Sequence, residues 1–415
     1  MILLLNGQVM TKETTKQGWP IFRMAFRSFF LFAALFSLIA IATWVLSLTG
    51  YIHFSPLHGG LFWHSHEMLF GFSSAIISGF LLTAVQNWTG FVTIKGKILA
   101  LLLLLWFSAR VLLAFELGVT AILIMLIDIC FLPIVALCIF IAIFKARQWR
   151  NLFFVPVLLI MSGLNVLMHL SAFEKIEMSY LNISYIMVLM VTLIMSIIGG
   201  RVFPMFTANG TKTKKAEPIK WLELSSIFSI VACVIVATDL LNLPILLQGL
   251  VFVMAGLLNF LRSIRWRVSF KLSLQTPLVS SLHISYWAIC LGLLIIGFDK
   301  LDLFRLLHFR VTAFSYHSLG LHSITVGGIG LMILSMISRV SLGHTGRELK
   351  LNNWMFFAFI FMLFAFITRV ILPFFINDFM IPLYISAGFW VLAYGLFVIV
   401  YLPILFKERT GAGLG

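Results

Sequence analysis

The chain has 415 residues, of which 61% are hydrophobic and only 10% are charged. A soluble protein carries roughly 25% charged residues, so this composition excludes a soluble globular protein. The formal net charge is +15. Such a charge would indicate nucleic-acid binding only if the basic residues formed a patch on a soluble domain.

The apolar residues come in long blocks, which predict an all-α polytopic membrane protein. A helix needs about 20 mostly apolar residues to cross a bilayer, whereas a β-barrel strand alternates over about ten. We therefore expect one transmembrane domain over 28–405, between an N-terminal segment (1–27) and a C-terminal tail (406–415). Its twelve predicted spans lie near 28–50, 67–86, 98–116, 119–144, 152–173, 181–203, 223–242, 244–262, 277–298, 318–339, 354–376 and 379–405.

The basic residues lie in alternate loops and predict the orientation of the spans. Of the 29 Lys and Arg residues, 23 fall on the side that also holds both termini. By the positive-inside rule this side is the cytoplasm. The first 27 residues lack the apolar segment of a signal peptide, so the first span is expected to act as an uncleaved insertion signal. The outer side keeps only Arg110, Lys175, Lys300, Arg305, Arg310 and Arg369.

Eight of the ten histidines are predicted to lie on the outer side. Polar residues within a membrane usually face a cavity, a cofactor or each other, and imidazole suits iron, copper and zinc. His66, His169 and His322 are expected at a similar depth, near the outer ends of their spans. The alternative for each is an imidazole that is hydrogen-bonded within the protein. The eight are His53, His58, His64, His66, His169, His308, His317 and His322.

The sequence assigns roles to some of these residues. We expect His66 and His322 to face each other as ligands in one cofactor site. His64 would serve the same metal, or a neighbouring one, from the end of the loop, provided that it precedes the helix; positions two apart on a helix point to nearly opposite faces. His169 and His317 are further candidate ligands.

Glu67, next to His66, is the candidate catalytic residue. A carboxylate there can orient an imidazole that binds a metal, or it can move a proton. The alternative is an acid at a helix N-terminus, where the helix dipole favours negative charge.

Small residues follow both histidine motifs, and they would let a flat cofactor or another helix approach closely. Helix packing alone is the alternative explanation. Both motifs also end in Thr-Gly at the same distance, which suggests a four-helix unit used three times, with the sixth span in the middle copy. The small residues are Gly71, Ala75 and Gly79 in the second span, and Gly327, Gly328 and Gly330 in the tenth.

An ordered set of motifs, stretching from the first span to the eleventh, resembles the NnrS family. Ser28 and Gln86 stand where proline is expected in many relatives, which affects loop shape more than chemistry. The motifs are Phe26-Arg27 with Phe29-Phe30; His64-Ser65-His66-Glu67-Met68-Leu69-Phe70-Gly71-Phe72; Asn87-Trp88-Thr89-Gly90; Gly199-Gly200-Arg201 with Pro204, Phe206 and Thr207; His322 with Thr325-Val326-Gly327-Gly328; and Arg339 with Leu342-Gly343-His344-Thr345-Gly346-Arg347.

The resemblance implies a bacterial inner-membrane protein that contains haem and copper and takes part in the response to nitric oxide and nitrosative stress. It implies His64, His66 and His322 as ligands, because each stands in a matched motif. The chain lacks CxxCH, so the haem would be non-covalent. The resemblance does not identify a reaction, and whether the protein is an enzyme stays open.

Two other functions remain open from the sequence. A transporter for a metal or a nitrosylated species should show broken helices with polar residues near mid-membrane, for which Asp128 is the main candidate. A membrane gas sensor should carry a soluble signalling domain, which the sequence does not predict. The expected partners are the lipid bilayer and nitric oxide or a related small molecule, without nucleic acid, and the oligomeric state is open.

Overall fold

The computed structural model describes residues 18–266, 276–308, 311 and 313–411, and this part of the chain is helical without strands. Most of the predicted N-terminal segment (1–27) lies outside the described residues. Within these residues, twelve helices are long and apolar enough to cross a membrane. They are Ala25–Leu48, Gly60–Thr89, Gly96–Ala114, Ala121–Ala146, Trp149–Ala172, Tyr180–Thr211, Lys220–Ala237, Ile245–Ile264, Pro277–Lys300, Tyr316–His344, Asn353–Phe374 and Met380–Phe406.

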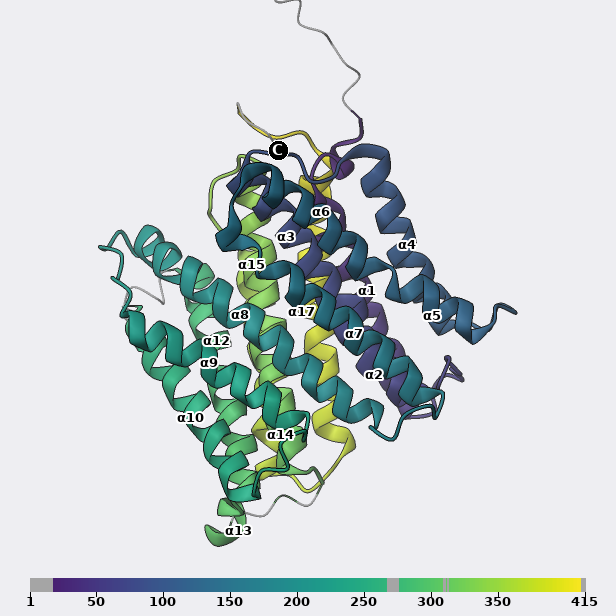
Figure 1. Cartoon of the computed structure of the whole chain (residues 1–415), viewed down its shortest axis with the longest axis vertical. Coiled ribbons are helices and arrows are strands. Elements are labelled where there is room, and N and C mark those ends of the chain that lie inside the picture. Colours follow the sequence, from purple (N-terminus) through teal and green to yellow (C-terminus); the bar gives the residue numbers. More distant parts are fainter. Residues whose placement is uncertain (1–17, 267–275, 309–310, 312, 412–415) are drawn as a thin grey trace, which may run out of the picture.

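Several of these spans are built from more than one helical segment (Figure 1). The simple spans are α1 (Ala25–Leu48), α4 (Gly96–Ala114), α8 (Tyr180–Thr211), α9 (Lys220–Ala237), α10 (Ile245–Ile264), α12 (Pro277–Lys300) and α17 (Met380–Phe406). The composite ones are α2 (Gly60–His66), η2 (Glu67–Ser73) and α3 (Ser74–Thr89); α5 (Ala121–Ile129) and α6 (Phe131–Ala146); η3 (Trp149–Asn151) and α7 (Phe154–Ala172); α14 (Tyr316–His322), η4 (Ser323–Gly330) and α15 (Leu331–His344); α16 (Asn353–Val370) and η5 (Leu372–Phe374).

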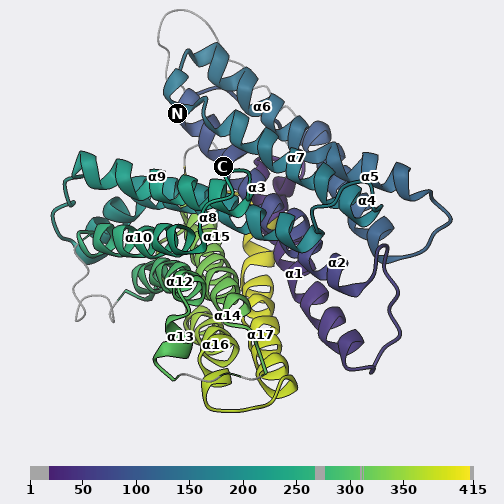
Figure 2. The ribbon, with the colours of Figure 1, turned by 60° about the horizontal axis from the view of Figure 1, so that its bottom comes forward.

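The spans pack in a ring, and the four-helix unit stays a prediction. The first span of each predicted unit packs against the last span of the preceding one, in the pairs α7 with α6, α12 with α10, and α1 with α17. The last pair closes the series into a ring, and Figure 2 shows α1 and α17 side by side. The second, sixth and tenth spans are the most buried: in their apolar 18-residue stretches, 83% of the residues in α2–η2–α3 are buried, and 78% in both α8 and α14–η4–α15.

Both described ends of the chain lie at the same end of the bundle. Arg23 Nη2 lies 2.7 Å from Glu408 Oε1. Arg27, inside α1, donates from Nη1 to the carbonyl oxygens of Leu405 and Lys407, at 2.8 and 2.9 Å. These contacts agree with an even number of spans, while the assignment of this end to the cytoplasm stays a prediction.

A π-helical segment directly follows each of the two predicted ligand histidines in the second and tenth spans. η2 begins after His66, and η4 begins after His322. The hydroxyls of Ser73, the last residue of η2, and Ser74, the first of α3, donate to carbonyl oxygens five residues earlier, at 2.8 and 2.9 Å. Single π turns inside helices occur frequently at functional sites, so the backbone itself marks both positions.

Candidate metal centre

The second span begins earlier than predicted, and this changes the place of His64. Helix α2 starts at Gly60, after Gly59 with a φ of +87° that suits glycine. Its first turn contains Leu61, Phe62 and Trp63, which were predicted to lie in the loop before the span. His64 and His66 are therefore both helical and point to different sides. The expectation that His64 precedes the helix is wrong.

His66 is completely buried and both of its ring nitrogens have partners. Nδ1 lies 3.0 Å from Oε1 of Glu67, which is also completely buried. Nε2 lies 2.9 Å from Asn165 Oδ1 and 3.1 Å from Asp128 Oδ2. Phe62 and Phe70 cover the imidazole, with ring centroids 5.4 and 5.1 Å away. The imidazole is thus fixed in orientation and shielded from water.

Asp128 is the centre of the cluster because its carboxylate contacts three spans at once. Its Oδ2 lies 3.2 Å from His169 Nε2 and accepts a hydrogen bond of 2.7 Å from Asn165 Nδ2, in addition to the contact with His66. Its Oδ1 pairs with Arg110. Asp128 lies near the end of α5, where the fourth span is interrupted before α6. The carboxylate of Asp128 lies inside the bundle.

The charges in this cluster balance only when one imidazole is protonated. Arg110 also lies 3.2 Å from Glu67 Oε2. Glu67, Arg110 and Asp128 are each at most 4% exposed. Two carboxylates and one guanidinium leave a net charge of −1 while the imidazoles are neutral. A buried charge is costly unless it is compensated, so the cluster would accept a cation or a proton.

A metal ion fits the donor atoms of His66, Asp128 and His169. One ligand atom from each lies within 4.8 Å of the others. Two ligand atoms about 2.1 Å from one ion are about 3.0–3.4 Å apart at ordinary coordination angles. The observed Nε2–Oδ2 separations of 3.1 and 3.2 Å match this range. Two imidazoles with one carboxylate suit copper, iron or zinc.

His58 lies in the loop before α2, on the outer side of the cluster under the predicted orientation. Its ring centroid is 6.1 Å from that of His169. Burial, together with the neighbouring His169 and His66, lowers the pKa of His58 to about 4. A neutral imidazole with a buried, unpartnered Nε2 therefore faces the site. The sequence placed His58 among the outer histidines without a role.

A second cluster surrounds His322 and differs in its contacts. His322 Nδ1 lies 2.8 Å from the carbonyl oxygen of Ser318, and its Nε2 lies 3.3 Å from Arg369 Nη2. His64 stacks on Trp44 with a centroid distance of 4.9 Å. It lies within electrostatic range of both Arg369 and His322.

The structure thus groups the predicted site residues in two clusters. It brings His66, Glu67 and His169 together in one cluster, and His64 with His322 in the other. His317 lies apart, with its ring 4.8 Å from that of Tyr185. His66 and His322 each contact a different set of partners. The predicted pairing of the two in one cofactor site therefore stays a prediction.

Three residues of the site, Arg110, Asp128 and Asn165, were not predicted from the sequence to belong to it. The first two are charged residues inside predicted or observed spans, and intramembrane charge is itself a signal of function. Asp128 was noted for this reason, but as a transporter residue. Asn165 carries no charge and stands in an apolar helix, so its contact with His66 could be found only from the packing of α7 against the second span.

The glycine faces below the two histidines are filled by protein side chains. A Cβ at Gly79 would meet Phe29 at 2.7 Å, and one at Gly330 would meet Trp390 at 2.5 Å. These aromatic rings occupy the space that a flat cofactor would need. Close helix packing is therefore the reading that the contacts support, and the residues fit a metal ion better than they fit a haem slot.

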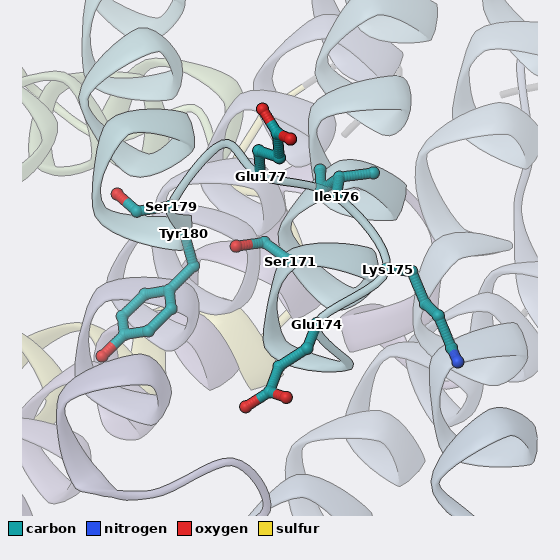
Figure 3. Close-up of a pocket in the computed structure, with 7 residues that line it drawn as sticks. All are labelled: Ser171, Glu174, Lys175, Ile176, Glu177, Ser179 and Tyr180. Carbon is teal, nitrogen blue, oxygen red and sulfur yellow. The ribbon is translucent and has the colours of Figure 1, made fainter.

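A surface pocket lies next to the metal-compatible cluster (Figure 3). Its volume is about 450 Å³, and it sits where α7 passes into α8. Tyr180, at its edge, contacts Phe62 with a ring-centroid distance of 5.6 Å, and Phe62 stacks on His66. Two aromatic rings thus separate the pocket from the site. The lining residues are Ser171, Glu174, Lys175, Ile176, Glu177, Ser179 and Tyr180.

Comparison with known proteins agrees with the motifs. The family model described as NnrS protein matches residues 20–409, nearly the whole chain. No curated protein matches the chain.

Proposed function

The chain belongs to the NnrS family, and we propose that it is a bacterial inner-membrane protein that binds copper and non-covalent haem and protects against nitric oxide and nitrosative stress. The observation that carries the metal part is the buried His66–Asp128–His169 group. Its donor atoms, its spacing and the two carboxylates of the cluster favour a bound cation. The nitric oxide part rests on the family.

Copper is the ion that the family suggests for this group. Copper bound there would supply a redox-active centre. Asp128 and the two imidazoles would hold the ion, and Asn165 would keep the carboxylate in place through its 2.7 Å hydrogen bond. Glu67 would accept the Nδ1 proton of His66 and so present Nε2 to the ion. Partners of this kind orient ligand imidazoles in metal sites.

Access to the site would run from the adjacent pocket. A small uncharged gas needs only transient movement of Tyr180 and Phe62, whose rings separate the pocket from His66. Water and ions would meet the same apolar barrier. We therefore propose that the site selects a small, weakly polar ligand.

The haem part of the proposal rests on His64 and His322. These histidines come from the second and tenth spans and lie within electrostatic range of each other. His322 Nδ1 bonds to a backbone carbonyl oxygen, as is usual for an imidazole that binds a metal through its other nitrogen. The filled glycine faces are the observation that speaks against this part.

Metal analysis and optical spectroscopy of purified protein test the proposal. Wild type is expected to hold copper and to show a haem Soret band that acidified solvent extracts. His169→Ala should lose the copper, because it removes one of three ligands. His53→Ala is the matched control, since His53 is an exposed histidine of the first outer loop. Protein that is free of copper and haem after supplementation would reject the proposal.

One observation favours a transporter as a second candidate. The fourth span is broken between α5 and α6, with a buried carboxylate, Asp128, just before the break. Interrupted helices near coupling-ion sites are typical of secondary transporters. Uptake of copper into sealed vesicles that contain the purified protein would favour this function over the first.

A further inference from the structure

Arg369 is a buried cation whose guanidinium is only partly satisfied. It is the second-last residue of α16 and is 8% exposed. Its Nη2 lies 3.3 Å from His322 Nε2, and its guanidinium lies 4.6 Å from the ring centroid of Phe314. Its Nη1 is buried and has no hydrogen-bond partner.

Three other buried arginines of the described chain have anionic or carbonyl partners that Arg369 lacks, whereas Arg339, also buried, lies over the ring of Phe206. Arg110 pairs with two carboxylates, and Arg262 pairs with Glu223. Arg27 donates to two carbonyl oxygens at the end of α17. Within the described residues no carboxylate lies within ion-pair distance of Arg369. The end of its own helix offers only a partial negative charge, and a buried charge without a partner is costly.

The contacts of His322 make this imidazole an acceptor toward Arg369. A backbone carbonyl can only accept, so Nδ1 carries the proton in the 2.8 Å bond to Ser318. In the neutral ring Nε2 is then the acceptor, and it faces the guanidinium. His322 therefore satisfies one N–H of Arg369 but adds no negative charge.

We infer that Arg369, beside the neutral imidazole of His322, forms a site for a carboxylate or another small monovalent oxyanion. A guanidinium presents two N–H groups in one plane, and this fork matches the two oxygens of a carboxylate. Phe314 covers the guanidinium face, so the anion would approach the unpartnered Nη1 from the edge. His64, from the second span, stacks on Trp44 beside this site.

Two sources of this anion share the same chemistry. One is a free carboxylate or oxyanion from the outer aqueous phase. The other is a carboxylate of bound haem, and only this source rests on the proposed function. In the second case the haem would place its acidic group on Arg369, which would leave His322 Nε2 free of the guanidinium.

The test uses purified full-length protein and two substitutions of Arg369. Sodium formate is titrated at constant ionic strength, with sodium chloride as the balance, while the unfolding temperature and the Soret absorbance per protein are recorded. Arg369→Gln removes the charge and keeps polarity. Arg369→Met removes the charge and keeps an apolar stem, so it should fold even if the glutamine does not. Arg305→Gln is the control, because Arg305 is 86% exposed.

A free anion should raise the unfolding temperature of wild type and Arg305→Gln as formate saturates the site. Both Arg369 variants should lose this response, with at least about tenfold weaker formate binding. A haem carboxylate should instead make wild type indifferent to formate, and the Arg369 variants alone should lose Soret absorbance. The inference is overturned if wild type and both Arg369 variants show the same change of unfolding temperature with formate and the same Soret absorbance per protein. Because the formate arm needs neither haem nor copper, it can succeed where the proposed function fails.

Discussion

The His66 cluster and the His322 cluster share a construction but carry opposite charge. Each histidine stands before a π-helical segment of a deeply buried span. Each cluster takes an arginine from the following span, Arg110 in one and Arg369 in the other. Two carboxylates join the first cluster, and none pairs with the second among the described residues. One scaffold thus suits a cation at one position and an anion at the other.

The largest expected effect comes from removing the carboxylate at the centre of the first cluster. Asp128→Ala leaves Arg110 with one acid instead of two and takes away the partner of both imidazoles. Breaking a buried ion pair from one side typically costs about 3–5 kcal/mol. Thermal unfolding in detergent should show this loss together with loss of copper. Arg369→Met is the counterpart, and without added anion it should be at least as stable as wild type. Equal losses of stability in Asp128→Ala and Arg369→Met would contradict the expected difference between the two clusters.

Substitution of His66 and of His322 should affect different cofactors, copper in the first case and haem in the second. His66→Ala takes a ligand from the proposed copper group and should abolish copper binding while the haem spectrum remains. His322→Ala should alter the haem spectrum and leave copper in place, because its contacts belong to the second cluster. Metal analysis and absorbance on the same samples measure both. If each substitution removed both cofactors, the predicted single site that joins His66 and His322 would be favoured.

Glu67→Gln should have a smaller effect than loss of a ligand. The glutamine still accepts from His66 Nδ1 but no longer carries the charge that faces Arg110. Loss of such a supporting partner typically costs about 10–100-fold in metal affinity or activity. Competition with a copper chelator of known strength gives the affinity. Unchanged affinity would make Glu67 only a partner of Arg110.

The smallest effect is expected from crowding the first cluster through its backbone. A Cβ at Gly71 would lie 2.8 Å from Arg110 Nη1, Glu67 Oε2 and Phe36, so Gly71→Ala should cost about 1–3 kcal/mol by overpacking. Gly163→Ala is the control, because a Cβ at Gly163 meets nothing within 4 Å. Its unfolding temperature should equal or exceed that of wild type. Equal behaviour of the two variants would mean that the cluster is loosely packed.

The sequence predicted the spans well because long apolar blocks determine membrane helices directly. It predicted the histidine clusters only in part, for a geometric reason. Depth follows from position along a helix, so His66, His169 and His322 could be placed near one level. Which of them meet depends on how the helices pack side by side, and apolar blocks carry little information about that. The helix start at Gly60 was missed because three apolar residues before His64 read equally well as part of a loop.

The closure of the helix ring by α1 and α17 has a consequence for the synthesis of the protein. The first span enters the bilayer while the last is still to be translated, so the face of α1 that packs on α17 must meanwhile be covered by lipid or by an insertion factor. Arg27 also lacks these hydrogen-bond partners until then, because the two carbonyl oxygens that it binds belong to Leu405 and Lys407. Maturation of the bundle is therefore tied to the end of translation. If translation stalled before α17, the ring of helices would stay open, and Arg27 would lie at the open side without its carbonyl partners.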